Sequence, residues 1–351
     1  MEKIINNHSF KIERVLKSKR TKKKSFNFFN QKGKIIKDKK TLERIKKMRI
    51  PPNYDNVKIS DNPNNKIQAI GFDNKGRKQY IYNQDFINLQ KNIKYEKYLI
   101  LGKYLKTIEK DINKIINKIH NKPYRKWEQP STNTSIVLYL LNNSLFRIGS
   151  YKYYNLYGSH GAITLKGEHI ELNEDKKLVN IKFIGKKGVI NEAHLTDTKL
   201  FNIFKTLKNK KTGYFLFDFK SNNHIYNITA DDIQKYLNNY NEVIVPKMFR
   251  TWHTNCEFIK MVKDKLDYFK NLENNNQLTN KIKKGFIKET MLLISQKLHN
   301  TPTVLKNSYL DNLILDMFLN KTDKLIKIID KNRHLSKDKL LISLTKKLRK
   351  L

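Results

Sequence analysis

Several common features are missing from this sequence. It has one cysteine, Cys256, so an intramolecular disulfide cannot form and a cysteine-based zinc site is not expected. We therefore expect a reducing, intracellular location. There is no apolar run of the roughly 18 residues that would suggest a transmembrane helix. The N-terminal stretch lacks the apolar core of a signal peptide. No G-x-x-x-x-G-K-[ST] loop for nucleotide phosphates occurs either.

Acidic residues are also scarce. The chain has 32 Asp and Glu against 72 Lys and Arg, which gives a formal net charge of +40. A domain with this charge repels itself unless a polyanion neutralises it, and DNA does so with release of its condensed counterions. Part of the lysine accompanies a general richness in Asn and Ile, as AT-rich coding produces. Charge alone therefore indicates a nucleic-acid partner and defines no activity.

Short alternating segments predict a small β-rich domain near the N-terminus. Before it, residues 1–24 end in a basic run and are interpreted as a solvated, partly disordered arm. From residue 25, strand-like segments alternate with turns, and one short helix capped by Thr41 lies among them. We expect a mainly antiparallel β domain over residues 25–88, with strands near 26–29, 57–60, 66–72 and 78–82.

Beyond residue 88 helical periodicity dominates, which predicts a larger, mostly α-helical domain over residues 89–351. Residues 177–194 depart from it and predict a β-hairpin. Thr229 and Asp232 resemble a capping box that opens a helix. Further helices are expected at 85–121, 134–146, 197–207, 254–271, 279–298 and in the tail from 310. The expected fold class is therefore α+β, a small β domain followed by a mostly helical one with a hairpin.

Four residues could together break a phosphodiester. Arg147 and Arg250 stand in apolar surroundings, where an arginine either pairs with a buried carboxylate or points into a functional cleft. The planar guanidinium can bind two phosphate oxygens, lysine can protonate a leaving oxygen, and tyrosine can form a phosphate ester. Lys186 at a hairpin tip and Tyr309 between helices also have ordinary explanations, an exposed turn and simple packing. None of the four is specific alone.

Taken in order along the chain, these segments resemble the type IB DNA topoisomerases, particularly the compact poxvirus and bacterial enzymes. The likeness extends from about residue 25 to about residue 315. The segments that carry it are Lys24–Phe28, Thr41–Ile45 with Ile50–Pro52, Ile67–Asp73 with Gly76–Tyr80, Phe146–Gly149 with Thr164–Lys166, Phe183–Lys186, Lys247–Thr251, and Asn300–Pro302 with Ser308–Tyr309. One such block could arise by chance, whereas several in the family's order indicate relationship.

The resemblance implies a role for each of five residues. Tyr309 would be the nucleophile that takes the 3′ phosphate, and Arg147 and Arg250 would bind the scissile phosphate oxygens. Lys186 would be the general acid for the 5′ oxygen. The fifth family position falls on Asn300, nine residues before the tyrosine (309 − 9 = 300) and directly before Thr-Pro. Bacterial-type members have asparagine there and poxviral members histidine, so the neighbouring His299 stays open as the alternative. No metal and no cofactor is implied.

DNA contacts are implied in both domains. Gln79, Tyr80 and Tyr82 lie on one predicted strand, with the two tyrosines on the same face, and would contact a groove or the phosphates. The alternative is a face of a packed sheet. Lys152 and Tyr153 match a helix that contacts the major groove in poxviral enzymes. Ser150 replaces a basic residue that is often found there, so the poxviral target preference is not carried over.

Two other classes of protein remain as alternatives. A tyrosine recombinase or integrase shares the Arg/Lys/Arg/Tyr chemistry, but it carries a His-x-x-Arg box where this chain has Arg250-Thr251-Trp252-His253, and its N-terminal domain is helical. A non-catalytic DNA-packaging protein would account for the charge alone. The favoured hypothesis is a monomer that clamps duplex DNA wherever the genome lies. The composition further suggests a large DNA virus as the source.

Overall fold

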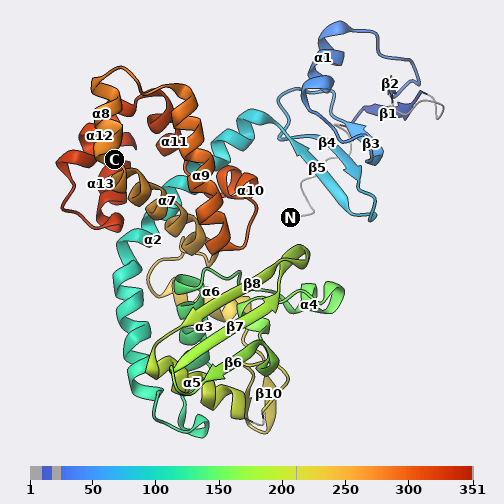
Figure 1. Ribbon diagram of the computed structural model, residues 1–351. Coiled ribbons are helices and arrows are strands. Elements are labelled where there is room, and N and C mark those ends of the chain that lie inside the picture. Colours follow the sequence, from blue (N-terminus) through green and yellow to red (C-terminus); the bar gives the residue numbers. More distant parts are fainter. Residues whose placement is uncertain (1–9, 18–24, 211, 350–351) are drawn as a thin grey trace. The chain divides into compact units, whose positions relative to one another are not determined.

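The computed structural model describes residues 10–17, 25–210 and 212–349. It comprises two compact units, Met1–Lys94 (unit 1) and Tyr95–Leu351 (unit 2), and the division falls within the long helix α2 (Gln84–Ile119). Most of the basic run that was predicted to close an N-terminal arm lies outside the described residues. The expected fold class, a small β domain followed by a larger helical one, is confirmed (Figure 1).

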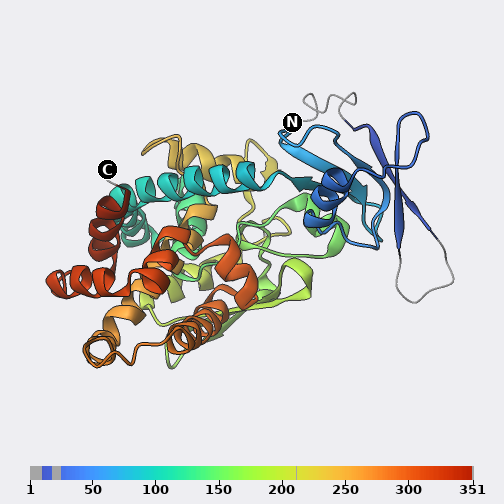
Figure 2. The same cartoon turned by 90° about the horizontal axis from the view of Figure 1, so that it is seen from above.

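In its described residues, unit 1 holds a five-stranded antiparallel sheet, one short helix and the first turns of α2. The strand order is β2-β1-β3-β4-β5, and β2 with β1 forms one edge, drawn in blue in Figure 2. A small core of Ile12, Ile45, Val57, Ile59 and Ala69 lies between the sheet and the helix. The elements are β1 (Ile12–Leu16), β2 (Phe26–Asn30), α1 (Lys39–Lys47), β3 (Asp55–Ile59), β4 (Ile67–Phe72) and β5 (Lys78–Tyr82).

Strand β1 corrects the expectation of an arm that continues to residue 24. Its first residue, Ile12, is buried and pairs with both β2 and β3. Arg14 belongs to the fold as well, because it donates to the carbonyl oxygen of Pro51 at 3.0 Å and its guanidinium lies 4.1 Å from the ring centre of Phe26. This strand was not predicted, because its charged residues are also typical of a solvated arm. Its partners β2 and β3 come later in the chain.

Helix α1 begins earlier than expected. Its N-cap is Asp38, whose carboxylate accepts a hydrogen bond from the Thr41 backbone N–H at 2.8 Å, so Thr41 lies inside the first turn. The carboxylate also suits the positive end of the helix dipole. Apart from β1, the strands of unit 1 were located to within two residues, and β5 has the predicted bounds.

Unit 2 is mostly helical (Figure 1). Helix α7 packs against α3, α9 and α13, and α10 packs against α9. Within the described residues, no helix is long and apolar enough to cross a membrane. After α2 the helices are α3 (Ser131–Asn143), α4 (Tyr151–Tyr157), α5 (Thr198–Asn209), α6 (Ala230–Asn238), α7 (Lys247–Asp264), α8 (Leu266–Asn274), α9 (Asn280–Leu298), α10 (Pro302–Ser308), α11 (Asn312–Asn320), α12 (Thr322–Lys331) and α13 (Lys337–Arg349).

Two small sheets complete unit 2. The first has the order β6-β7-β8, formed by β6 (Ile170–Asn173), β7 (Leu178–Ile184) and β8 (Ile190–Leu195), and α5 packs against it. The β7–β8 pair is the predicted hairpin, and its tip is the short 3₁₀ turn η6 (Lys186–Gly188). The second pairs β9 (Phe219–Ser221) with β10 (His224–Tyr226), which the sequence did not indicate.

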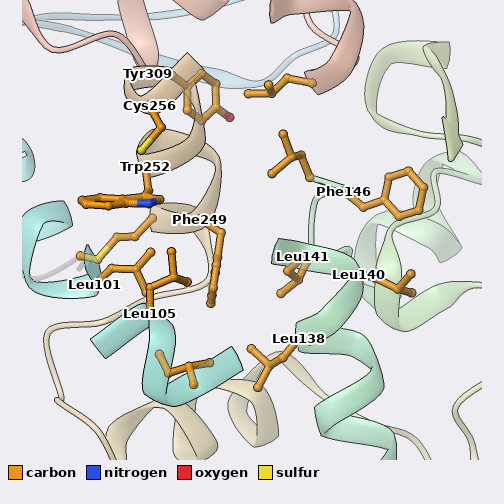
Figure 3. Packing of buried hydrophobic residues seen from close by; sticks show 14 of the residues in the cluster. Leu101, Leu105, Leu138, Leu140, Leu141, Phe146, Phe249, Trp252, Cys256 and Tyr309 are labelled. Atoms are coloured by element: carbon orange, nitrogen blue, oxygen red, sulfur yellow. The ribbon is translucent and has the colours of Figure 1, made fainter. Parts of the chain in front are cut away.

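Helix α7 lies in the centre of the unit 2 core. Figure 3 shows Phe249 of α7 between Leu105 of α2 and Leu141 of α3. Trp252 is completely buried, and a Cβ at Gly102 of α2 would come within 2.1 Å of its ring. Gly102 therefore permits α2 to approach α7 closely. Interiors pack at crystal-like density, so this contact fixes the position of α7.

Helix boundaries in unit 2 required three corrections. The helix expected over 254–271 is two helices, because Lys265, at φ −102° and ψ 20°, separates α7 from α8. Helix α7 also begins at Lys247, seven residues before the expected start. Helix α3 ends at Asn143, so Arg147 lies in an irregular segment and not at a helix end. The capping box of Thr229 and Asp232 at α6 is confirmed.

Candidate active site

Tyr309 lies at the end of a short, well-defined helix. Thr301 caps α10, accepting from the Val304 N–H at 3.3 Å, and Pro302 occupies the first turn, where its missing N–H costs nothing. Tyr309 is the C-cap of this helix and donates its own N–H to Leu305 at 2.9 Å. The side chain is 6% exposed, and its hydroxyl points away from Cys256 and Trp252 in Figure 3.

Arg250 lies directly beside the Tyr309 phenol. It is 3% exposed on α7, and its Nε donates to the Tyr309 hydroxyl at 3.3 Å. Its other nitrogens donate to the carbonyl oxygens of Leu145 and, at 2.6 Å, of Leu298. No buried carboxylate pairs with it among the described residues. The guanidinium is therefore anchored by backbone carbonyls at the ends of two segments, and its positive charge is directed at the phenol.

Arg147 is held by a tight backbone arrangement. Leu145 and Gly149 have positive φ values of 54° and 89°. The Arg147 carbonyl accepts from the Ala162 N–H at 2.9 Å, and a Cβ at Gly161 would come within 2.4 Å of the Gly149 Cα. A glycine at both positions lets the two segments touch. Arg147 is half-buried, and its guanidinium donates to the side-chain oxygen of Asn300.

The structure separates Asn300 from His299. His299 ends α9 in the left-handed conformation, at φ 49°, so the two neighbouring side chains diverge. The His299 Nε2 accepts from the Glu192 N–H of β8 at 3.4 Å, whereas Asn300 meets Arg147. The Asn300 Nδ2 is buried and has no hydrogen-bond partner within the described part of the chain. A buried donor of this kind is a candidate ligand for an incoming acceptor.

The charges around Tyr309 change its acidity. Burial acts to raise the pKa of the phenol, but the positive charges of Arg250, Arg147 and Lys247 and the hydrogen bond from Arg250 outweigh it, so the pKa is lowered. The Arg250 guanidinium carbon lies 5.3 Å from the ring centre of Tyr309, and the Lys247 ammonium lies 6.0 Å from it. The arrangement favours the phenolate and attracts an anion to its side.

Lys186 is not part of this contact network. It is exposed at the tip of the β7–β8 hairpin, followed by Lys187 and Gly188 at positive φ values of 64° and 74°. Among the described residues, no hydrogen bond or ion pair joins Lys186 to Arg147, Arg250 or Asn300. The base of the tip is fixed, because the Ile184 carbonyl accepts from the His160 N–H at 2.9 Å.

The predicted DNA-contacting residues lie in two places. In unit 1, Tyr80 and Tyr82 share one face of β5 with ring centres 6.3 Å apart, and Gln79 donates to the Asp73 carboxylate at 3.0 Å. These tyrosines line a surface cavity of about 460 Å³ together with Arg44 and Lys47. A cavity with cations and aromatic rings is suited to nucleic acid.

In unit 2, Lys152 and Tyr153 lie on α4. This helix buries none of its residues, and Tyr153 is 58% exposed and stacks on Tyr157 at 6.1 Å. Tyr151 of this helix packs against the core and donates to the Ile163 and Ile228 carbonyls, whereas the exposed Tyr153 and Tyr157 are available to a partner.

Two neighbours of Tyr309 were missed as functional residues by the sequence reasoning. Lys247, at the start of α7, contributes to the lowered pKa of the phenol. Asn255 is completely buried on the same helix, and its side-chain amide donates to the Tyr309 carbonyl at 2.9 Å and accepts from the Asp311 N–H at 2.8 Å. Lys247 precedes Arg250 by three residues and so shares its face of the helix, which was an available signal. Asn255 follows Arg250 by five residues and does not share that face, and no sequence pattern marked it.

The net charge of +40 and the buried arginine that donates to a phenol are typical of an enzyme that acts on nucleic acid. More specifically, the chain belongs to the type IB DNA topoisomerases, which are isomerases that act on DNA. Residues 83–336 match the family described as "Eukaryotic DNA topoisomerase I, catalytic core", and residues 25–73 match "Bacterial DNA topoisomerase IB, N-terminal domain". Membership over most of the chain sets aside the recombinase and packaging alternatives.

Curated viral proteins are similar over most of their length. The chain is 29% identical over 291 residues to "DNA topoisomerase 1B" of Acanthamoeba polyphaga mimivirus, covering 81% of this chain and 82% of that protein. It is 25% identical over 308 residues to "DNA topoisomerase I" of Monkeypox virus and 24% identical to "DNA topoisomerase 1B" of Vaccinia virus (strain Copenhagen), in each case covering 84% of this chain and 86% of the relative.

Proposed function

We propose that this chain relaxes supercoiled duplex DNA by transient cleavage of one strand, with Tyr309 as the nucleophile. The phenol oxygen attacks a backbone phosphorus, a 3′-phosphotyrosyl bond forms, and the bond from phosphorus to the 5′ oxygen breaks. The phenol gives up its own proton to solvent, and the 5′ oxygen leaves with a proton supplied by Lys186. The broken strand then rotates about the intact one. Afterwards the free 5′ hydroxyl attacks the phosphotyrosine, which re-forms the DNA backbone and releases the Tyr309 phenol. One phosphate ester replaces another, so neither ATP nor metal is needed.

One observation carries this assignment: the Arg250 Nε donates to the Tyr309 hydroxyl at 3.3 Å. A phenol is a weak nucleophile at neutral pH because its ordinary pKa is about 10. The cations around Tyr309 lower that pKa, which raises the phenolate fraction. A tyrosine that merely packed in the core would be expected to show the opposite shift, because burial alone disfavours the charged form.

The two arginines and Asn300 would stabilise the transition state. The attacked phosphate gains negative charge on its non-bridging oxygens, and preorganised donors at that place lower the barrier. Arg147 and Arg250 supply guanidinium groups, and the unpartnered Asn300 Nδ2 supplies an amide donor. An amide cannot release a proton at neutral pH, so Asn300 would stabilise charge and take no part in proton transfer.

Lys186 would protonate the departing 5′ oxygen. Lys186 is exposed at a hairpin tip. For this role, it must come close to the phosphate when DNA is bound. The tip is short and contains two residues at positive φ, and the strands behind it are firmly paired. We therefore expect the tip alone to adjust, while the hairpin keeps its register.

DNA would be held by both units of a single chain. Gln79, Tyr80 and Tyr82 of β5 would contact it from unit 1, and Lys152 and Tyr153 of α4 from unit 2. We expect a monomeric clamp that works wherever the DNA genome is located. The similarity to viral proteins supports a large DNA virus as its source.

The test is relaxation of a negatively supercoiled plasmid by the purified chain in EDTA, without ATP. We expect a ladder of topoisomers that proceeds to full relaxation, and a covalent protein–DNA adduct when SDS is added during the reaction. Positively supercoiled plasmid should be relaxed as well, because strand rotation is driven by torque of either sign. A requirement for ATP or magnesium would refute the mechanism.

A further inference from the structure

Two buried tyrosines of α2 touch the segment that follows Tyr309. Tyr95 is 1% exposed and Tyr98 is 0% exposed, and their rings meet edge to face at 6.1 Å. Residues at i and i+3 lie on the same face of a helix. The Tyr95 hydroxyl donates to the carbonyl oxygen of Leu310, and the Tyr98 hydroxyl donates to the Asp311 carboxylate at 3.4 Å.

Asp311 fixes the start of the next helix. Its carboxylate caps α11 by accepting from the Leu313 N–H at 3.0 Å, and it is completely buried. Its N–H donates to Asn255 of α7 at 2.8 Å. Asn255 and the two tyrosines therefore hold the residues immediately after Tyr309 from two different helices.

The two buried hydroxyl groups require a physical explanation, because most of their surroundings are apolar. Burying a hydroxyl costs free energy unless it forms a hydrogen bond, and phenylalanine would fill the same volume without that cost. Both hydroxyls are directed at Leu310 and Asp311, over sequence separations of 215 and 213 residues. Packing alone does not require this, whereas fixing the backbone beside a reactive side chain does.

We propose that Tyr95 and Tyr98 are positioning residues for Tyr309: they fix Leu310 and Asp311 so that the phenol stays beside Arg250. This role rests on the proposed function of Tyr309 as the nucleophile. Tyr309 is a C-cap residue outside regular helical geometry, at φ −131° and ψ −32°, so its own helix does not hold it completely. Misplacement of a reacting group by about 1 Å can cost a hundredfold in rate.

The experiment uses the full chain with Tyr95→Phe, Tyr98→Phe and the double substitution, and Tyr104→Phe as a matched control. Tyr104 is a half-buried tyrosine of the same helix that packs against the same core. Cleavage of a duplex with one preferred site is measured in a single turnover across pH. Non-covalent DNA affinity is measured with Tyr309→Phe added, and thermal unfolding is measured for each variant.

We expect each single substitution to slow cleavage by about tenfold, which corresponds to one buried hydrogen bond, with DNA affinity unchanged. The rising limb of the pH–rate profile should move to higher pH, because a phenol that leaves Arg250 loses the charge that acidifies it. Tyr104→Phe should change neither. A purely structural role would lower the melting temperature while the folded protein kept its rate and pH profile, and that result would overturn the proposal.

Different results would refute the nucleophile assignment of Tyr309 and the positioning role of Tyr95 and Tyr98. If the unsubstituted chain forms no covalent adduct, or forms it equally with Tyr309→Phe, the nucleophile assignment fails and the positioning role fails with it. If the unsubstituted chain cleaves through Tyr309 while Tyr95→Phe and Tyr98→Phe cleave at the same rate and pH dependence, only the positioning role is refuted.

Discussion

The segment around Tyr309 and the tip of the β7–β8 hairpin differ in how far they are fixed before DNA is bound. Tyr309 and Arg250 are buried, hydrogen-bonded to each other and supported by backbone carbonyls. Lys186 is exposed on a short turn, and within the described residues no hydrogen bond or ion pair joins it to Arg147, Arg250 or Asn300. If the proposed roles hold, the nucleophile is preorganised before DNA binds, and the proton donor joins the site only when DNA is bound.

This difference has a chemical consequence. A phenolate beside two guanidinium groups is ready to attack, and without its acid the departing 5′ oxygen would leave as a strongly basic alkoxide. Keeping the lysine away until DNA is in place would restrict cleavage to correctly bound substrate.

Tyr309→Phe should abolish cleavage and relaxation, with a loss of at least about 10⁴-fold, because no other group can take its place as nucleophile. The substitution removes only the hydroxyl, so folding and DNA affinity should be preserved. Plasmid relaxation and gel-shift titration check the two expectations. Residual relaxation above contamination level would mean that the nucleophile lies elsewhere.

Lys186→Ala should slow cleavage by about 10²- to 10⁴-fold, the range for loss of a general acid. Thermal stability should stay within about 0.5 kcal/mol, since the residue is exposed at the tip of the hairpin. A duplex with a 5′-bridging sulfur at the cleavage site should restore the rate, because a thiolate leaves without a proton. The unsubstituted chain on the same duplex serves as the control, and an equal defect on both substrates would refute the acid role.

Asn300→Ala should slow cleavage by about tenfold or more through loss of a charged-phosphate contact. His299→Ala should have a smaller effect, because its imidazole contacts the Glu192 backbone and not Arg147. The two rates are compared under single-turnover conditions with saturating protein. A larger defect for His299→Ala would move the fifth site residue by one position.

Lys247→Ala should give the smallest effect and the most specific one. Its ammonium helps to lower the pKa of Tyr309, so its removal lets that pKa rise towards the usual value. The phenolate fraction at a given pH then falls, and the rising limb of cleavage against pH should move to higher pH. Lys306→Ala, an exposed lysine of α10, is the control. An unchanged profile would remove Lys247 from the site.

Much of the architecture followed from local patterns. Strand β5, the β7–β8 hairpin and the capping box at Thr229 are specified by alternation and turn residues close in sequence. Strand β1 was missed because its partners β2 and β3 lie further along the chain, and its charged residues resembled an arm. The break at Lys265 was missed because periodicity continues across it.

The candidate site was also predictable only in part from the sequence. Its residues could be named from the resemblance, but their meeting depends on contacts between distant segments, such as those of Arg250 and Tyr309, which are 59 positions apart. His299 and Asn300 point in different directions because His299 has a left-handed backbone conformation. The order of residues in the sequence does not show that conformation. The support from Asn255, Tyr95 and Tyr98 was likewise visible only once the helices were packed.

The most direct measurement is to identify the residue that carries DNA after SDS trapping. The adduct is digested with protease and nuclease, and the modified peptide is sequenced by mass spectrometry. We expect a single nucleotide-linked peptide that contains Tyr309, with the phosphate of the DNA 3′ end attached to the phenol oxygen. Attachment at another residue, or at a 5′ phosphate, would contradict it.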